Sequence, residues 1–206
     1  MRGVLFDWAG TCATEGEPLI APVLNRKTGL TLDELNIRTE DIYNKYAVGA
    51  LTKENFWRQI LDRLDLSNDN DVKVPELSAE YLRSSVVYPH VLSVAKKMRE
   101  NGLVVALLSN STPEMSRHIQ HTFATKDYFD FEIYSCDPDV ADVKPNPKPF
   151  DVALQKMKLR AADVLFIDNS RKNIAAAKDL GMQTLLFTTP DQFVRDIKMV
   201  YKDLYE

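Results

Sequence analysis

The residues of this sequence best able to do chemistry are two carboxylates, a hydroxyl and an ammonium group. Asp7, Ser109 and Asp168 each follow a short apolar run, and Lys144 lies in a proline-rich loop between the last two. Two carboxylates suit a Mg²⁺ ion, which takes hard oxygen ligands, and a metal with a lysine neutralises a phosphoryl group. A carboxylate can itself be a nucleophile and form an aspartyl-phosphate. Together the four residue types indicate chemistry on an anionic group.

Short apolar runs that alternate with helix-like segments position these residues. The runs have the length of buried strands and cover residues 4–6, 103–108, 131–134, 164–167 and 183–187. Helices are predicted between and after the later runs, over residues 90–100, 113–123, 149–157, 170–180 and 190–204. This order predicts an α/β fold, a Rossmann-like parallel sheet with helices on both faces. Ligands bind at the carboxyl ends of such strands, so the residues that follow them should meet there.

The stretch between the first two runs has a different character. It contains no convincing strand, and its periodicity and turn signals predict helices over residues 18–28, 32–46, 52–64 and 75–85. We therefore predict a core formed by residues 1–15 and 87–206 and an inserted α-helical unit formed by residues 16–86.

Composition limits the classes of protein that this chain can be. Its 206 residues are 45% hydrophobic, with 30 acidic and 26 basic residues and a net charge of −4, which argues against a nucleic-acid partner. No apolar run approaches the roughly 20 residues of a membrane helix, and the N-terminus lacks the features of a signal peptide. Cys12 and Cys136 have no metal-ligand spacing and are expected to be reduced thiols. These features predict a cytoplasmic protein with no membrane partner.

The four chemical positions resemble the motifs of the haloacid dehalogenase-like (HAD) hydrolases. The first motif is an apolar strand followed by Asp-x-Asp-Gly-Thr, which here reads Asp7-Trp8-Ala9-Gly10-Thr11. The second is a strand that ends in Ser109, followed by Asn110, and the third is Lys144 followed by Pro-Asn-Pro. The fourth is a strand that ends in Asp168, followed by Asn169 and, further on, Gly181-Met182. The resemblance covers essentially the whole chain, and the insertion resembles the helical cap of one branch of the superfamily.

The resemblance implies a role for each position. Asp7 would be the nucleophile, Ser109 and Asn110 would bind the transferring group, and Lys144 would steady the nucleophile and bind the substrate. Mg²⁺ would be held by the carboxylates of Asp7 and Asp168 and by the backbone carbonyl of Ala9. The cap would close over the site and exclude water. The resemblance therefore predicts a Mg²⁺-dependent hydrolase, most simply a phosphatase of a small phosphorylated metabolite.

Ala9 departs from the pattern of the family's phosphatases. They usually have Asp at this position, as the acid that protonates the leaving group, and its loss costs typically about 10²–10⁴-fold in rate. Glu15 and Glu17 are the nearest carboxylates in sequence that could substitute for it. Without them, hydrolysis of a phosphate monoester would be compromised.

Ala9 therefore leaves three alternatives open. Phosphonoacetaldehyde hydrolases share Asp-Trp-Ala-Gly-Thr and need a cap lysine that forms a Schiff base, for which Lys45 and Lys53 are the candidates by location. L-2-haloacid dehalogenases also lack the acid and have a second motif similar to residues 108–115. The third alternative is a catalytically weakened domain that binds a phospho-ligand or a protein. The sequence predicts no oligomeric state.

Overall fold

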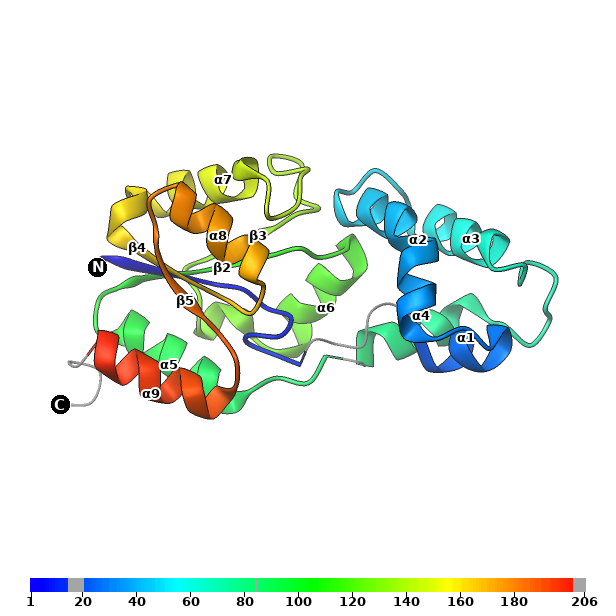
Figure 1. Cartoon of the computed structure of the whole chain (residues 1–206), viewed down its shortest axis with the longest axis horizontal. Helices are drawn as coiled ribbons and strands as arrows, with labels where there is room; N and C mark the ends of the chain where they lie inside the picture. The colour runs from blue at the N-terminus through cyan, green and yellow to red at the C-terminus, as the bar shows by residue number, and fades with distance from the viewer. Residues whose placement is uncertain (15–20, 84, 202–206) are drawn as a thin grey trace.

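The computed structural model describes residues 1–14, 21–83 and 85–201. Two groups of elements lie side by side: a parallel sheet with helices on both faces, and a separate group of helices (Figure 1). The predicted α/β fold with a Rossmann-like parallel sheet is confirmed.

Five parallel strands form the sheet, in the order β3-β2-β1-β4-β5. Their bounds are β1 Gly3–Phe6, β2 Val104–Ser109, β3 Phe131–Tyr134, β4 Val164–Asp168 and β5 Gln183–Leu186. The three central strands are almost entirely buried, as expected for strands covered on both faces. Because β1 lies between β2 and β4, the carboxyl ends of these three strands are neighbours.

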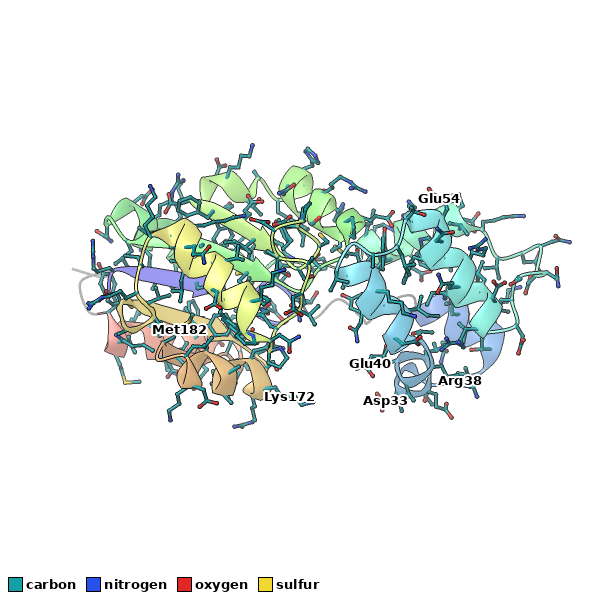
Figure 2. The ribbon with its side chains drawn as sticks, turned by 90° about the horizontal axis from the view of Figure 1, so that it is seen from above. Asp33, Arg38, Glu40, Glu54, Lys172 and Met182 are labelled. Atoms are coloured by element: carbon teal, nitrogen blue, oxygen red, sulfur yellow. The ribbon has the colours of Figure 1, made fainter. Side chains whose placement is uncertain are left out.

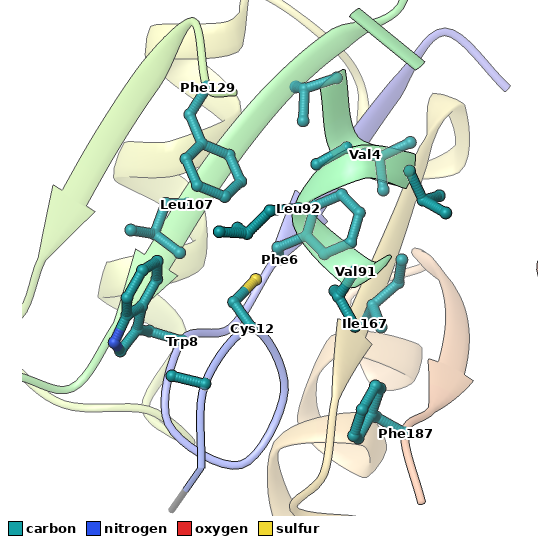
Figure 3. Packing of buried hydrophobic residues seen from close by; sticks show 14 of the residues in the cluster. Val4, Phe6, Trp8, Cys12, Val91, Leu92, Leu107, Phe129, Ile167 and Phe187 are labelled. Atoms are coloured by element: carbon teal, nitrogen blue, oxygen red, sulfur yellow. The ribbon is translucent and has the colours of Figure 1, made fainter. Parts of the chain in front are cut away.

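Alternate residues of the strands pack against helices on opposite faces, as the two-residue period of a strand requires. Phe6 packs on one face with residues of α5 (Pro89–Glu100), α6 (Pro113–Thr122) and α9 (Pro190–Val200), as Figure 3 shows for part of this cluster. Leu5 packs on the other face with residues of α7 (Pro147–Met157) and α8 (Arg171–Asp179). Two short 3₁₀ helices, Thr125–Asp127 and Ala161–Asp163, complete the core.

The helical group has a hydrophobic core of its own. Its helices are α1 Ala21–Thr28, α2 Leu32–Ala47, α3 Lys53–Arg63 and α4 Val74–Arg83. Tyr46, Phe56 and Trp57 are among the largest side chains in that core, while charged residues such as Asp33 and Glu40 project from the group into solvent (Figure 2). Tyr81 of α4 instead packs in the cluster of the sheet, so the two groups are also in contact there. The predicted division into residues 1–15 and 87–206 and residues 16–86 stays a prediction. The proposed boundary at residues 15 and 16 lies outside the described residues.

The chain segments that enter and leave the helical group are hydrogen-bonded to each other. Thr14 N donates to Val86 O at 2.7 Å, and Tyr88 N donates to Cys12 O at 2.8 Å. An antiparallel bridge joins Ala13 to Val87. The helical group is thus attached to the core through a paired two-segment connection.

The predicted elements agree with the structure to within a few residues. The last helix, predicted to run to Leu204, ends at Val200, because Tyr201 has φ −137° and ψ 82°, outside the helical region. Residues 202–204 lie outside the described residues. The predicted start of the first helix of the insertion, at Pro18, lies outside the described residues. Over the part of the chain that the structure describes, no helix is long and apolar enough to cross a membrane.

Candidate active site

Three of the four chemical residues meet at the carboxyl ends of adjacent strands. Asp7 directly follows β1, Ser109 ends β2 and Asp168 ends β4. Asp7 N donates to Ile167 O at 2.9 Å, which continues the pairing of β1 with β4 up to the carboxylates. Strand order alone therefore brings together residues separated by more than a hundred positions.

The ammonium group of Lys144 joins the two carboxylates. Its Nζ lies 2.6 Å from Asp7 Oδ1 and 2.9 Å from Asp168 Oδ2, and it also donates to Leu108 O at 2.8 Å. These contacts use all three donors of a lysine. The side chain of Lys144 is 1% exposed and that of Asp168 is 0% exposed. Lys144, Asp7 and Asp168 therefore form a buried ion-pair group in which every donor of the ammonium has an acceptor, unlike a surface salt bridge.

Burial and mutual charge shift the pKa values within this group. Burial raises the pKa of Asp7 to about 7, with Asp168 raising it further and Lys144 opposing the rise. Burial by itself would lower the pKa of Lys144, but the attraction of Asp7 and Asp168 outweighs it and leaves the pKa above its ordinary value. With one ammonium and two carboxylates, the ionised group carries a net negative charge and favours a cation beside it.

Asn110 fixes the backbone of Lys144. Its Oδ1 accepts from Lys144 N at 2.8 Å, and its Nδ2 donates to Lys144 O at 2.9 Å. Because Asn110 directly follows Ser109, this pair of hydrogen bonds ties the lysine loop to the end of β2. The predicted contact of Asn110 with the substrate stays a prediction, since both ends of its amide bind the loop.

Asp168 has further partners that the sequence did not reveal. Its Oδ1 accepts from Ser170 N at 2.7 Å, and its Oδ2 accepts from Asn173 Nδ2 at 3.0 Å as well as from Lys144. Asn173 stands on the first turn of α8, five residues after Asp168, a spacing that could have been noticed because a helix start faces the strand that precedes it. These bonds hold the carboxylate in one orientation.

Ser109 and the turn after Asp7 complete the site. The Ser109 side chain is buried, and its hydroxyl makes no hydrogen bond with any described residue, which leaves it able to bind a ligand. The turn is closed by the amides of residues 11–13, which donate to Trp8 O, and Gly10 has φ 81°, which favours glycine. Ala9 is exposed on this turn, so a larger side chain has room there.

The donor set of the site fits Mg²⁺. Asp7 has one oxygen not used by Lys144, Asp168 Oδ1 has a further lone pair, and the carbonyl of Ala9 accepts no hydrogen bond from the described residues. These are hard oxygen atoms, and Mg²⁺ commonly takes one or two carboxylates and keeps several waters. No cluster of three His, Cys, Asp or Glu residues able to hold a metal occurs within the described ranges. The fit therefore depends on the backbone carbonyl and on water.

The two candidate Schiff-base lysines are both ion-paired. Lys53 Nζ contacts Glu114 and donates to Ser78 Oγ at 2.7 Å, and Lys45 lies 3.8 Å from Asp41 on the outer surface of α2. A lysine forms a Schiff base through its amine, and in both residues that amine is engaged with a carboxylate. Glu15 and Glu17, the candidate replacements for the missing acid, lie outside the described residues.

Residues 1–181 match the family model of the haloacid dehalogenase-like hydrolases. The chain belongs to this family. It is therefore a hydrolase, and the resemblance of its motifs to those of the HAD hydrolases is confirmed.

Curated relatives include proteins of different lengths. Phosphoglycolate phosphatase of Aquifex aeolicus is 26% identical over 192 residues, which is 90% of this chain and 84% of the relative. Bifunctional epoxide hydrolase 2 of Sus scrofa is 25% identical over 65% of this chain but only 26% of its own length. Acyl-CoA dehydrogenase family member 10 of Mus musculus is 26% identical over 95% of this chain and 18% of its own length. The chain thus spans about a quarter or less of these last two relatives.

Solved structures share the fold. A HAD family enzyme from Bacteroides thetaiotaomicron has a TM-score of 0.78 with 20% identity, over 91% of this chain and 94% of that one. The same enzyme has been crystallised in complex with magnesium and inorganic phosphate. An L-2-haloacid dehalogenase from Xanthobacter autotrophicus with covalently bound chloropropionic acid has a TM-score of 0.66 with 18% identity, over 98% of this chain and 84% of that one. At these identities the likeness shows the fold alone.

Proposed function

We propose that this chain hydrolyses small phosphate monoesters through an aspartyl-phosphate on Asp7, with Mg²⁺ as cofactor. In the first step an oxygen of Asp7 bonds to phosphorus, the bond to the leaving oxygen breaks, and that oxygen takes a proton from water. In the second step water attacks phosphorus, the bond to Asp7 breaks, and inorganic phosphate leaves with the carboxylate restored. Ser109 donates a hydrogen bond to the phosphoryl group, and Lys144 keeps Asp7 oriented and offsets negative charge.

One observation carries the proposal: a single buried lysine joins the carboxylates that follow β1 and β4, beside the unpartnered hydroxyl that ends β2. This arrangement orients Asp7 and keeps its charge partly neutralised, so that an anionic substrate can approach it. Mg²⁺, held by Asp7, Asp168 and the Ala9 carbonyl, would supply further positive charge beside the phosphoryl oxygens. The phosphatases among the relatives, and the neighbour with magnesium and phosphate, support this substrate class.

The helical group α1–α4 serves as the cap in this proposal. Two of the contacts between residues 16–86 and the core lie beside the site. Trp8, which follows Asp7, donates from Nε1 to Ser85 Oγ at 3.1 Å. Ser135, whose N donates to Ser109 O, donates from Oγ to Ala47 O at 2.6 Å. A cap in this place excludes water from the buried ion pairs and contacts the leaving group. The functional division is accordingly residues 1–15 and 87–206 as core and residues 16–86 as cap.

The direct test is turnover of an aryl phosphate with and without Mg²⁺. Its leaving group is stable as an anion and needs little help from an acid, so Asp7 should turn it over despite Ala9. We expect p-nitrophenol release that depends on Mg²⁺ and is lost when the metal is chelated. An absence of Mg²⁺-dependent release would contradict the proposal, and a further absence of turnover on phosphonoacetaldehyde and chloropropionate would indicate a binding domain instead.

A carboxylate at position 9 should increase the turnover of a substrate whose leaving group must be protonated. Ala9 is exposed, so Ala9→Asp introduces an acid beside Asp7 without displacing a buried side chain. We expect kcat for hexyl phosphate, whose leaving group must be protonated, to rise by about 10²-fold, and kcat for the aryl phosphate to change much less. Ala9→Asn is the matched control, because it adds the same volume without an acid. An equal rise in both variants would show that proton transfer is not what position 9 lacks.

Cleavage of a carbon–halogen bond is the second candidate, and Ala9 is the observation that favours it. Halide leaves without taking a proton, so an acid at position 9 is not required. In addition, Asp168 is already satisfied by Lys144, Ser170 and Asn173, as a site that works without metal would need. Metal-independent release of chloride from chloropropionate would favour this candidate over the phosphatase.

A further inference from the structure

A second buried polar cluster lies where the helical group meets the core. Lys53, the first residue of α3, contacts the carboxylate of Glu114 on α6 and donates to Ser78 Oγ on α4 at 2.7 Å. Ser78 Oγ also donates to Glu114 Oε1. Glu114 is 7% exposed and Ser78 is 3% exposed. None of these three residues belongs to the Asp7–Lys144–Asp168 group, and none has a role in the proposed reaction.

Polar atoms around this cluster have no protein partner. Glu114 Oε2, Tyr46 Oη and Trp57 Nε1 are buried and make no hydrogen bond with any described residue. Leaving a buried polar atom unpaired is costly, so such atoms commonly mark a place where another group binds. Three of them in one region of the molecule need a common explanation.

The three unpaired atoms belong to side chains that lie close together. The Tyr46 ring stacks on Phe56 with centroids 4.4 Å apart, and Phe56 meets Trp57 edge-on at 5.1 Å. Trp57 follows Lys53 by four residues on α3, which puts both on one face of the helix. Burial raises the pKa of the Tyr46 hydroxyl, and the negative charge of Glu114 raises it further, which agrees with Glu114 lying near Tyr46.

The hydrogen-bonding capacity of the cluster defines the group that it can bind. Tyr46 and Trp57 offer donors, and Glu114 Oε2 offers an acceptor, but Tyr46 and Glu114 are not bonded to each other. A group that both donates and accepts can therefore bridge them. The ammonium of Lys53 cancels the charge of Glu114, so the cluster gives no net attraction to an anion. A neutral hydroxyl has the required properties.

The cluster is connected to the catalytic end of β2. Glu114 lies five residues after Ser109, a distance of at most about 17 Å even for extended chain. Between them, Thr112 Oγ1 is hydrogen-bonded to Tyr81 Oη of α4 at 3.1 Å, and Ser111 N donates to Ser135 Oγ, which in turn donates to the carbonyl of Ala47, next to Tyr46. The cluster and the end of β2 that carries Ser109 are thus joined by short chain segments and by hydrogen bonds between the helical group and the core.

We propose that Tyr46, Trp57 and Glu114 form a specificity site that binds hydroxyl groups on the leaving group of the substrate. The substrate would then be a phosphate ester of a polyhydroxy alcohol or sugar rather than of a plain alkyl or an anionic alcohol. This inference rests on the proposed phosphatase function and names the substrate class for it.

Tyr46→Phe tests the site, because it removes only a hydroxyl that has no described protein partner. We would measure kcat/KM for sorbitol phosphate and for hexyl phosphate, which share chain length and primary leaving group and differ in hydroxyl groups. The wild-type protein should prefer sorbitol phosphate, and Tyr46→Phe should lower the ratio of the two kcat/KM values by about tenfold. Tyr88→Phe is the control, since Tyr88 stacks on Phe187 in the core, and it should leave the ratio unchanged.

A structural role would give a different result. If the Tyr46 hydroxyl only binds a buried water or supports the fold, Tyr46→Phe changes the melting temperature and leaves the ratio as in the wild-type protein, which overturns the proposal. Calorimetric titration with the same two esters separates the two proposals. If the wild-type protein turns over neither ester, the phosphatase proposal is contradicted. The site is still supported if Tyr46→Phe binds sorbitol phosphate more weakly than the wild-type protein and binds hexyl phosphate equally well. Equal binding in both proteins contradicts the site.

Discussion

Asp7→Asn should abolish hydrolysis, with kcat for the aryl phosphate falling by roughly 10⁴-fold or more, as expected when a nucleophile is removed. The amide cannot form the acyl phosphate, although it keeps nearly the same shape and size as the carboxylate. Steady-state release of p-nitrophenol measures the loss. Mass spectrometry of acid-quenched protein should find a phosphoryl group on the Asp7 peptide of the wild-type protein only.

The control for this variant is Asp151→Asn, which makes the same chemical change at an exposed position of α7. It should retain wild-type activity. Retention of activity in Asp7→Asn, or a phosphoryl group found on a different peptide, would show that Asp7 is not the nucleophile. Circular dichroism of both variants establishes that any loss belongs to the chemistry and not to unfolding.

Lys144→Met should lose activity and much of its stability together. The change removes the cation between two buried carboxylates, and breaking a buried ion pair from one side typically costs about 3–5 kcal/mol. Urea unfolding at pH 7 measures the loss of unfolding free energy. Lys156→Met is the matched control, because Lys156 pairs with Asp139 at the surface at 3.0 Å, where an ion pair contributes about 1 kcal/mol or less.

The cost of Lys144→Met should depend on pH in a defined direction. Burial already raises the pKa of Asp7, and Lys144 opposes that rise, so the pKa of Asp7 climbs further once the lysine is gone. The wild-type pKa of Asp7 is about 7, so Asp7 holds a proton in both folded proteins below that pH and the cost changes little there. Above pH 7 the folded variant keeps a proton that the wild-type protein releases, so the loss of unfolding free energy increases as the pH rises. A loss of stability that is the same at pH 6 and pH 9 would contradict the ion-pair account.

The double variant Lys144→Met/Asp7→Asn measures the interaction energy between Lys144 and Asp7, apart from the contribution of each side chain alone. Removing both charges leaves Asp168 with Ser170 N and Asn173, which continue to satisfy it. The double variant should therefore be more stable than the sum of the single losses predicts, by about 0.5–3 kcal/mol. Simple additivity would mean that Lys144 and Asp7 do not interact in solution as they do in the structure.

The edge of the sheet that carries the candidate site could be predicted from the sequence because its determinants are local. Each of Asp7, Ser109 and Asp168 directly follows an apolar run, and in a parallel sheet the carboxyl ends of these strands lie at the same edge. Alternation with helices predicts that the sheet is parallel, whereas the order β3-β2-β1-β4-β5 is known only from the structure. The position of Lys144 was predicted only by resemblance, since nothing in its proline-rich loop requires the side chain to turn inward.

Contacts between distant elements could not be predicted in this way. The pairing of Lys53 with Glu114 joins residues 61 positions apart on two separate helices, and each alone resembles an exposed charge at a helix start. The partner of Asp168 on α8 was missed because its effect depends on how the helix sits against β4. The unpaired hydroxyl of Tyr46 becomes evident only when its surroundings are known. Sequence patterns reveal which face is buried, but not which polar atoms remain unsatisfied there.

The paired connection formed by residues 12–14 and 86–88 makes the helical group a removable module. Its two ends leave the core at one place and already pair with each other, so the sheet register does not depend on what lies between them. Another inserted segment whose two ends pair in the same way can occupy that place while the strands keep their register. In the proposed function, selection can therefore change the helical group, which would contact the leaving group, while the strand ends that carry Asp7, Ser109 and Asp168 stay the same. A designer can graft another helical unit at the same point.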